Sequence, residues 1–98
     1  MKKVFDLKGE INAKTGKEYK EQIVALFNEA DILILSLKEV VYLNSSGLRE
    51  MIDLLKQSNS IKKEIRLCGM SKDIRYMFSF TGLEKVFKIY DTEKEAML

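Results

Sequence analysis

Four small polar residues, Asn44, Ser45, Ser46 and Gly47, stand between an apolar run and an amphipathic stretch. Asparagine is a strong helix N-cap, because its side-chain oxygen accepts a bond from backbone N–H groups that lack an intrahelical partner. The serines would then lie in the first helical turn, where the helix dipole stabilises a phosphate. The glycine costs about 1 kcal/mol relative to alanine, which is tolerated where a neighbouring strand or a partner protein approaches the backbone. The pattern fits either an ordinary capped turn or a site that accepts a phosphate.

Other site chemistry finds little support in the sequence. The chain has no histidine, which excludes the usual zinc sites and the Ser-His and Cys-His dyads. Its single cysteine, Cys68, lies in an apolar strand pattern, so we expect a buried, inert thiol. The stretch around Ser45 lacks the spacing and the lysine of a P-loop, and an enzyme with Ser45 or Ser46 as nucleophile would lack a visible base. We therefore predict no enzyme activity, no cofactor and no metal.

Composition indicates one globular domain over residues 1–98, with 46% hydrophobic and 33% charged side chains. The 17 basic and 15 acidic residues are spread along the chain, without the basic block of a nucleic-acid binder. No apolar run reaches the roughly 18 to 20 residues that cross a bilayer. The N-terminus lacks the apolar core of a signal peptide. We expect a cytoplasmic protein that neither binds nucleic acid nor inserts into a membrane.

Strand and helix patterns alternate along the chain. Predicted strands cover residues 3–9, 31–37, 64–69 and 85–90, and predicted helices cover residues 15–30, 44–58, 72–80 and 92–98. We expect Thr15 to cap the first helix and Gly82 to end the third in a left-handed conformation. Residues 31–37 are continuously apolar, which is typical of a central parallel strand. The alternation predicts an α/β fold, with a mostly parallel sheet of four to five strands and about four helices.

Several segments, taken in order, resemble the STAS domain family, and in particular the bacterial anti-sigma factor antagonists. "KGEINAKT" is similar to the family's G-E-[IL]-D strand end, "DILILSLKEVVYLNSSG" to its central strand and switch loop, "LNSSGLREMI" to its D-S-[ST]-G-L segment, and "MFSFTGLEKVFKIYDTEKEAM" to its C-terminal T-G-L…I-x-x-T-x-x-E-A pattern. The resemblance covers nearly the whole chain and implies a single STAS-like domain.

In that family, a partner kinase that is also the anti-sigma factor phosphorylates the serine after the acidic residue of the motif. Carried onto this chain, the resemblance implies phosphorylation of Ser45. The unmodified protein would capture the kinase and free the sigma factor, and a phosphate would block the capture by its charge. We expect docking at Asn44, Ser45, Ser46, Gly47, Arg49, Met70 and Ser71. Two simpler interpretations stay open, namely that Arg49 pairs with Asp53 and that Met70 belongs to the core.

The chain departs from the family pattern where Asn12 and Asn44 replace two expected aspartates. An amide caps a helix as well as a carboxylate does, but it is a poor substitute for a group that accepts or orients the serine proton. The alternative function is therefore a stand-alone STAS subunit of a transport or signalling assembly, without phosphorylation. Family members also have a strand ahead of residues 3–9, for which this chain has no room. Its loss would leave an unpaired sheet edge, which favours a homodimer or a covering partner.

Overall fold

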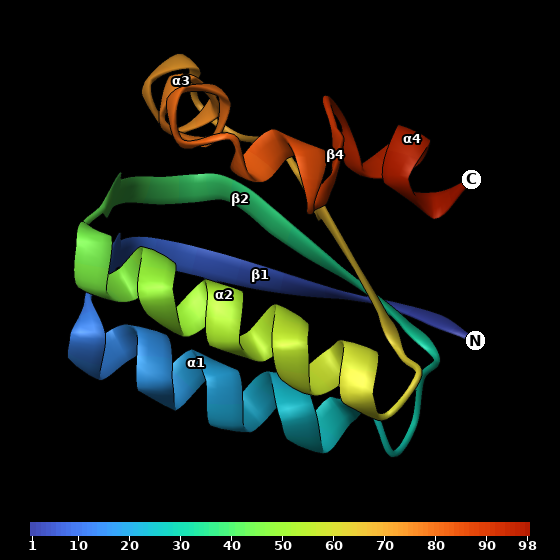
Figure 1. Ribbon diagram of the computed structural model, residues 1–98. Helices are drawn as coiled ribbons and strands as arrows, with labels where there is room; N and C mark the ends of the chain where they lie inside the picture. The colour runs from blue at the N-terminus through green and yellow to red at the C-terminus, as the bar shows by residue number, and fades with distance from the viewer.

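Four parallel strands form a single sheet in the order β1-β2-β3-β4 in the computed structural model, which describes residues 1–98 (Figure 1). The strands are β1 (Lys2–Ile11), β2 (Ile32–Leu43), β3 (Glu64–Cys68) and β4 (Lys88–Tyr90). The helices are α1 (Ala13–Leu26), α2 (Ser45–Ser60), α3 (Lys72–Thr81), the short 3-10 helix η1 (Leu83–Lys85) and α4 (Glu93–Met97). The predicted α/β fold is confirmed.

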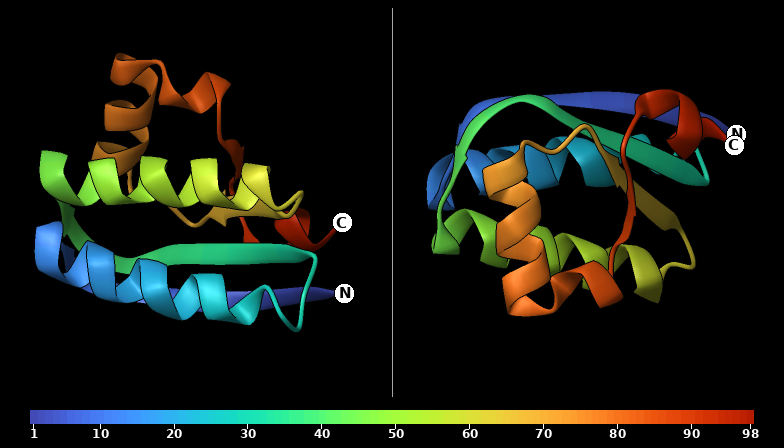
Figure 2. Two further views of the ribbon diagram at one scale, coloured as in Figure 1. Left: turned by 60° about the horizontal axis from the view of Figure 1, so that its bottom comes forward. Right: turned by 90° about the horizontal axis from the view of Figure 1, so that it is seen from above.

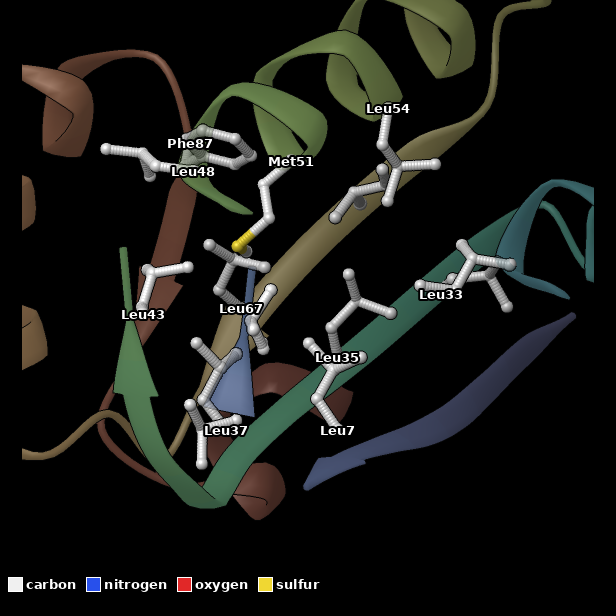
Figure 3. Close-up of a cluster of buried hydrophobic side chains, with 14 of the residues drawn as sticks. Leu7, Leu33, Leu35, Leu37, Leu43, Leu48, Met51, Leu54, Leu67 and Phe87 are labelled. Atoms are coloured by element: carbon white, nitrogen blue, oxygen red, sulfur yellow. The ribbon is translucent and has the colours of Figure 1, made fainter. Parts of the chain in front are cut away.

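The main core lies between the sheet and the paired helices α1 and α2, which run side by side on one of its faces (Figures 1 and 2). Every second residue in the first half of β2 contributes to this core: Leu33, Leu35 and Leu37. Three buried side chains of α2 pack there as well: Leu48, Met51 and Leu54 (Figure 3). Burying one such side chain stabilises the fold by about 1.5–3 kcal/mol, so this layer fixes where α2 begins and which face it exposes.

The short helix α4 packs on the opposite face of the sheet. Its Ala96 is fully buried and contacts Ile34 and Cys68. Burial raises the pKa of the Cys68 thiol, and the predicted burial of this cysteine is confirmed. Arg66 fastens α4 by donating a hydrogen bond of 2.7 Å to the Ala96 carbonyl. None of the helices combines the length and the hydropathy that a membrane span requires.

Three predicted strand boundaries are wrong. β2 continues to Leu43 instead of stopping at residue 37, because its second half pairs with the end of β1 after a shift in register. β1 likewise runs past Gly9, whose φ of 66° accompanies the irregular pairing there. The predicted strand 85–90 is also too long, since η1 occupies its start and β4 has only three residues.

Helix α1 starts earlier and ends earlier than expected. Asn12, and not Thr15, is its N-cap: the Asn12 side chain accepts bonds of 3.0 Å from the N–H groups of Lys14 and Thr15. The Thr15 hydroxyl accepts a bond of 2.9 Å from the Asn12 N–H, which completes a capping box. The helix ends at Leu26, four residues before the predicted end. The left-handed stop at Gly82, with a φ of 79°, is confirmed.

The ten-residue edge strand β1 is partly shielded by a tyrosine of α1. The Tyr19 hydroxyl accepts a hydrogen bond from the Lys8 N–H at 3.2 Å and donates one to the Lys8 carbonyl at 3.3 Å. Edge strands are ordinarily prone to pair with other chains, and satisfying their backbone groups internally prevents this. The homodimer expected at this edge stays a prediction, and it would have to use the part of β1 before Lys8.

Lys20 of α1 ties α1 to α2 through two carboxylates. Its ammonium lies 2.8 Å from Glu50 and 2.8 Å from Asp53. The hydrogen bond from Lys20, followed by one from Gln57, lowers the pKa of Asp53. The bonds to Asp53 and Glu50 raise the pKa of Lys20. The cluster therefore stabilises the helix pair over a defined range of pH.

Replacing Lys20 by methionine is expected to lower the free energy of unfolding by about 1 kcal/mol at neutral pH. Because the Asp53 pKa is lowered by folding, its stabilisation is complete above the ordinary aspartate pKa and is lost as pH falls through the lowered value. Urea unfolding at about pH 7 and about pH 2 should thus show the difference from the unmodified protein shrinking in acid. The exposed Lys17, which forms no ion pair, provides the matched Lys17→Met control. A difference that is unchanged in acid would contradict the assignment.

Candidate functional site

Two helix N-termini meet at one end of the sheet. Ile11 and Leu43 are the last paired residues of β1 and β2, and the N-caps Asn12 and Asn44 follow them directly. The Asn44 side chain accepts a hydrogen bond of 2.8 Å from the Gly47 N–H, as predicted for a cap at this position. The two asparagines that replace the expected aspartates therefore follow the last paired residues of neighbouring strands, and each caps one of two neighbouring helices.

Ser45 is the first residue of the 16-residue helix α2, and its side chain is exposed. It makes no hydrogen bond within the protein, in contrast to Ser58 and Ser60 near the other end of the helix, whose hydroxyls bond backbone carbonyls. Ser46 is half-buried. Ser45 is thus the accessible hydroxyl at the positive end of the α2 dipole, where an added phosphate would be stabilised.

Gly47 is buried beneath the first turn of α2. A Cβ at this position would lie 2.2 Å from the Ile11 carbonyl oxygen and 2.6 Å from its carbon. Of the two reasons considered for this glycine, the neighbouring strand applies, because it is the end of β1 that approaches the helix. Gly47 shapes the site from below, and any contribution to a docking surface would be indirect.

Gly16 of α1 has a related role that the sequence did not indicate. A Cβ there would lie 3.0 Å from the Glu50 Cβ and 3.5 Å from the Gly47 Cα. The two helices therefore approach closely beside the site. The only available signal was a glycine inside an amphipathic helical pattern, which is unfavourable by propensity alone.

Arg49 lies one turn after Ser45 on α2, is exposed, and forms no ion pair in the structure. The alternative pairing with Asp53 is wrong, since Asp53 binds Lys20 at 2.8 Å and Gln57 at 2.9 Å. Residues at positions i and i+4 of a helix lie on the same side. The guanidinium is therefore free to contact a partner or a phosphate next to Ser45.

Met70 and Ser71 follow the carboxyl end of β3, and parallel strands place their carboxyl ends at one edge of the sheet. Met70 is half-buried against the core, so the core interpretation holds in part, and its docking role stays a prediction. Ser71 caps α3, accepting a bond of 3.3 Å from the Ile74 N–H, and is exposed. The predicted site residues thus all follow the carboxyl ends of two neighbouring strands, β2 and β3.

Two exposed apolar side chains beside the cap of α2 were not predicted as part of the site. Val41 and Tyr42, at the end of β2, are 80% and 55% exposed. They were missed because the strand was expected to end at residue 37. Together with Arg49 and Ser45 they give this end of the molecule a mixed apolar and polar surface, as protein interfaces commonly have.

Sequence comparisons indicate one family, and solved structures share the fold. The sequence profile of the STAS domain matches residues 2–96. An anti-sigma-B factor antagonist of Listeria monocytogenes is 33% identical over 88 residues, which cover 89% of this chain and 77% of the relative. The anti-sigma factor antagonist SpoIIAA of Bacillus, in its unphosphorylated form, has a TM-score of 0.77 at 22% identity, covering 98% of this chain and 84% of its own. A sulfate transporter family protein of Wolinella succinogenes has a TM-score of 0.83 at 12% identity, covering 97% and 80%. At these identities the two structures show the common fold alone.

Proposed function

The chain belongs to the STAS domain family, and from this premise we propose that it binds a serine-kinase anti-sigma factor and is switched by phosphorylation of Ser45. The general role of an anti-sigma factor antagonist is supported by the relatives that carry this name. The observation that carries the finer proposal is the exposed Ser45 hydroxyl, which has no partner within the protein and stands directly after the cap of a long helix. We propose a binding module with no catalytic role.

The switch follows from the charge of a phosphate. A phosphoryl group adds about −1.5 to −2 charges and three acceptor oxygens. In the free protein, two groups would stabilise this charge on Ser45. Ser45 itself lies in the first turn of α2, at the positive end of the helix dipole, and the unpaired Arg49 lies one turn further along the helix. In a complex, the same charge would have to be removed from water against the partner's surface. Both effects favour the dissociated state, so the unmodified protein would be the form that binds.

A phosphorylated form of SpoIIAA is known, which supports phosphorylation as the switch in this family. The exposed Val41 and Tyr42 support the docking half of the proposal, since they would provide apolar contact area next to Ser45.

The proposal is tested with the purified protein and the serine-kinase anti-sigma factor of the same host. We expect a complex by isothermal titration calorimetry in the presence of nucleotide. Prolonged incubation with ATP should add a single phosphate to Ser45, detected by mass spectrometry, and dissociate the complex. Ser45→Ala should still bind but accept no phosphate. The absence of a complex under every nucleotide condition would overturn the proposal.

A second candidate function is favoured by the amides at Asn12 and Asn44, which take away two negative charges beside Ser45. In this alternative the chain is a stand-alone STAS subunit of a transport or signalling assembly, and Ser45 stays unmodified. The proteins that co-purify from the host discriminate between the two functions. A kinase of ATPase fold supports the first, and a transporter component supports the second.

A further inference from the structure

Helix α3 exposes a pair of stacked aromatic rings that the proposed switch does not use. Tyr76 and Phe80 are 68% and 78% exposed, and their ring centroids lie 6.0 Å apart with an interplanar angle of 27°. The opposite side of the helix is buried in the core through Ile74 and Phe78. The left view of Figure 2 shows α3 extending away from α1, α2 and the sheet. Each ring exposes on the order of 100 Å² of surface, so the pair forms an unusually apolar spot for an exposed helix face.

These rings belong to a row of side chains whose two ends are complementary to each other. Lys72, Tyr76 and Phe80 follow one another at intervals of four residues, which places them along one side of α3. A two-fold axis at Tyr76 would set the α3 of a second copy antiparallel to the first. Lys72 of each copy would then face Phe80 of the other, which is the arrangement of a cation–π contact. Antiparallel helices also place the opposite ends of their dipoles together.

The charges beside this row are complementary in the same orientation. Lys72 and Arg75 lie in the N-terminal half of α3, whereas Glu84 lies near its C-terminal half, 3.4 Å from the Ser79 hydroxyl. Lys72, Arg75, Ser79 and Glu84 are among the residues that line an open hollow of about 530 Å³ next to Tyr76, in which Arg75 already pairs with Asp91 at 3.7 Å. Lys72 has no ion pair within its own chain. In the antiparallel pair it would approach Glu84 of the second copy, and the same contact would form twice.

We propose that the face of α3 formed by Lys72, Tyr76, Phe80 and Glu84 is the interface of a weak homodimer. Self-complementarity favours a second copy over another protein, because a two-fold interface must match its own surface. This interface differs from the β1 edge, whose middle is shielded by Tyr19. Its four residues are not among those proposed to dock the kinase, although Met70 lines the same hollow. Failure of the dimer would therefore leave the proposed function untouched. The small area predicts a dissociation constant on the order of 100 µM.

Sedimentation equilibrium over a range of protein concentrations tests this interface. Tyr76→Ser is expected to raise the dissociation constant at least about tenfold. Tyr42→Ser, which alters an exposed tyrosine at the end of β2, is the matched control and should leave it unchanged. Lys72→Glu and Glu84→Lys should each weaken association, because each places like charges together. The double variant should recover part of it, since it exchanges the two charges and keeps their pairing, while the contact of Lys72 with Phe80 stays lost.

Three outcomes would overturn the dimer. The first is a monomeric mass of the unmodified protein up to about 1 mM, well above the expected dissociation constant. The second is an association that Tyr76→Ser leaves unchanged, including the case in which this variant weakens binding of the kinase instead. The third is a double charge exchange that recovers none of the association lost in the two single variants. All of these side chains are exposed or half-exposed, so circular dichroism should show each variant folded.

Discussion

Replacing Gly47 by alanine is expected to lower the free energy of unfolding by about 2–3 kcal/mol, although alanine is the better helix former. The added Cβ would lie 2.2 Å from the Ile11 carbonyl oxygen, a distance that real Cβ atoms do not reach. That oxygen also accepts a hydrogen bond of 3.1 Å from the Asn44 N–H, so the end of β1 cannot withdraw without breaking a contact with β2. Either the start of α2 or the end of β1 must move.

Urea unfolding measures this change as a lower midpoint at an unchanged slope. Gly16→Ala is the matched comparison on α1, where the closest atom would be the Glu50 Cβ at 3.0 Å. Because that atom belongs to a side chain and lies farther away, Gly16→Ala should lower the free energy of unfolding clearly less than Gly47→Ala does. A Gly47→Ala variant as stable as the unmodified protein, or more stable, would show that the close approach does not constrain the fold.

Replacing Ser45 by aspartate is expected to weaken binding of the serine-kinase anti-sigma factor by about 100-fold or more. The carboxylate introduces a charge at the centre of the proposed docking surface, and an uncompensated charge in an interface costs several kcal/mol. The fold itself should be unaffected, because Ser45 is exposed and an acidic residue in the first turn of α2 is favoured by the helix dipole. Weak binding with an unchanged thermal midpoint would therefore locate the effect at the interface.

Isothermal titration calorimetry with the kinase, alongside thermal unfolding, provides both measurements. Ser60→Asp makes the same change of charge at an exposed position near the opposite end of α2 and should bind as the unmodified protein does. Equal affinity of Ser45→Asp and Ser60→Asp would remove Ser45 from the interface.

Periodicity was sufficient to predict the fold and the location of the candidate site. The apolar spacing of α2 and the cap at Asn44 depend on neighbours within a few residues, so they are visible in the sequence. The second half of β2 is different: Lys38 and Glu39 interrupt its apolar run, and it stays a strand because β1 continues beside it. Local patterns carry no information about such a partner, which is why the exposed Val41 and Tyr42 were missed.

One wrong interpretation and one open alternative in the candidate site have the same origin. The pairing of Arg49 with Asp53 satisfies helix spacing, but Asp53 forms its ion pair with Lys20 of another helix instead. The sequence indicates that either a strand or a partner protein approaches the backbone of Gly47, and only the position of Ile11 shows that it is the strand. Both answers depend on how α1, α2 and β1 pack together, which is a tertiary property. A residue's type can thus indicate a close contact at its backbone without indicating which part of the structure makes that contact.

The phenol of Tyr19 also has a consequence for solubility. With its donor and its acceptor both engaged at Lys8, it occupies one pair of the backbone groups through which a foreign strand would extend the sheet outward. The aromatic ring of Tyr19 packs edge-on against Phe5 at a centroid separation of 5.8 Å, and this contact helps to hold the hydroxyl in position. One side chain thereby obstructs strand addition at one point of the long edge strand.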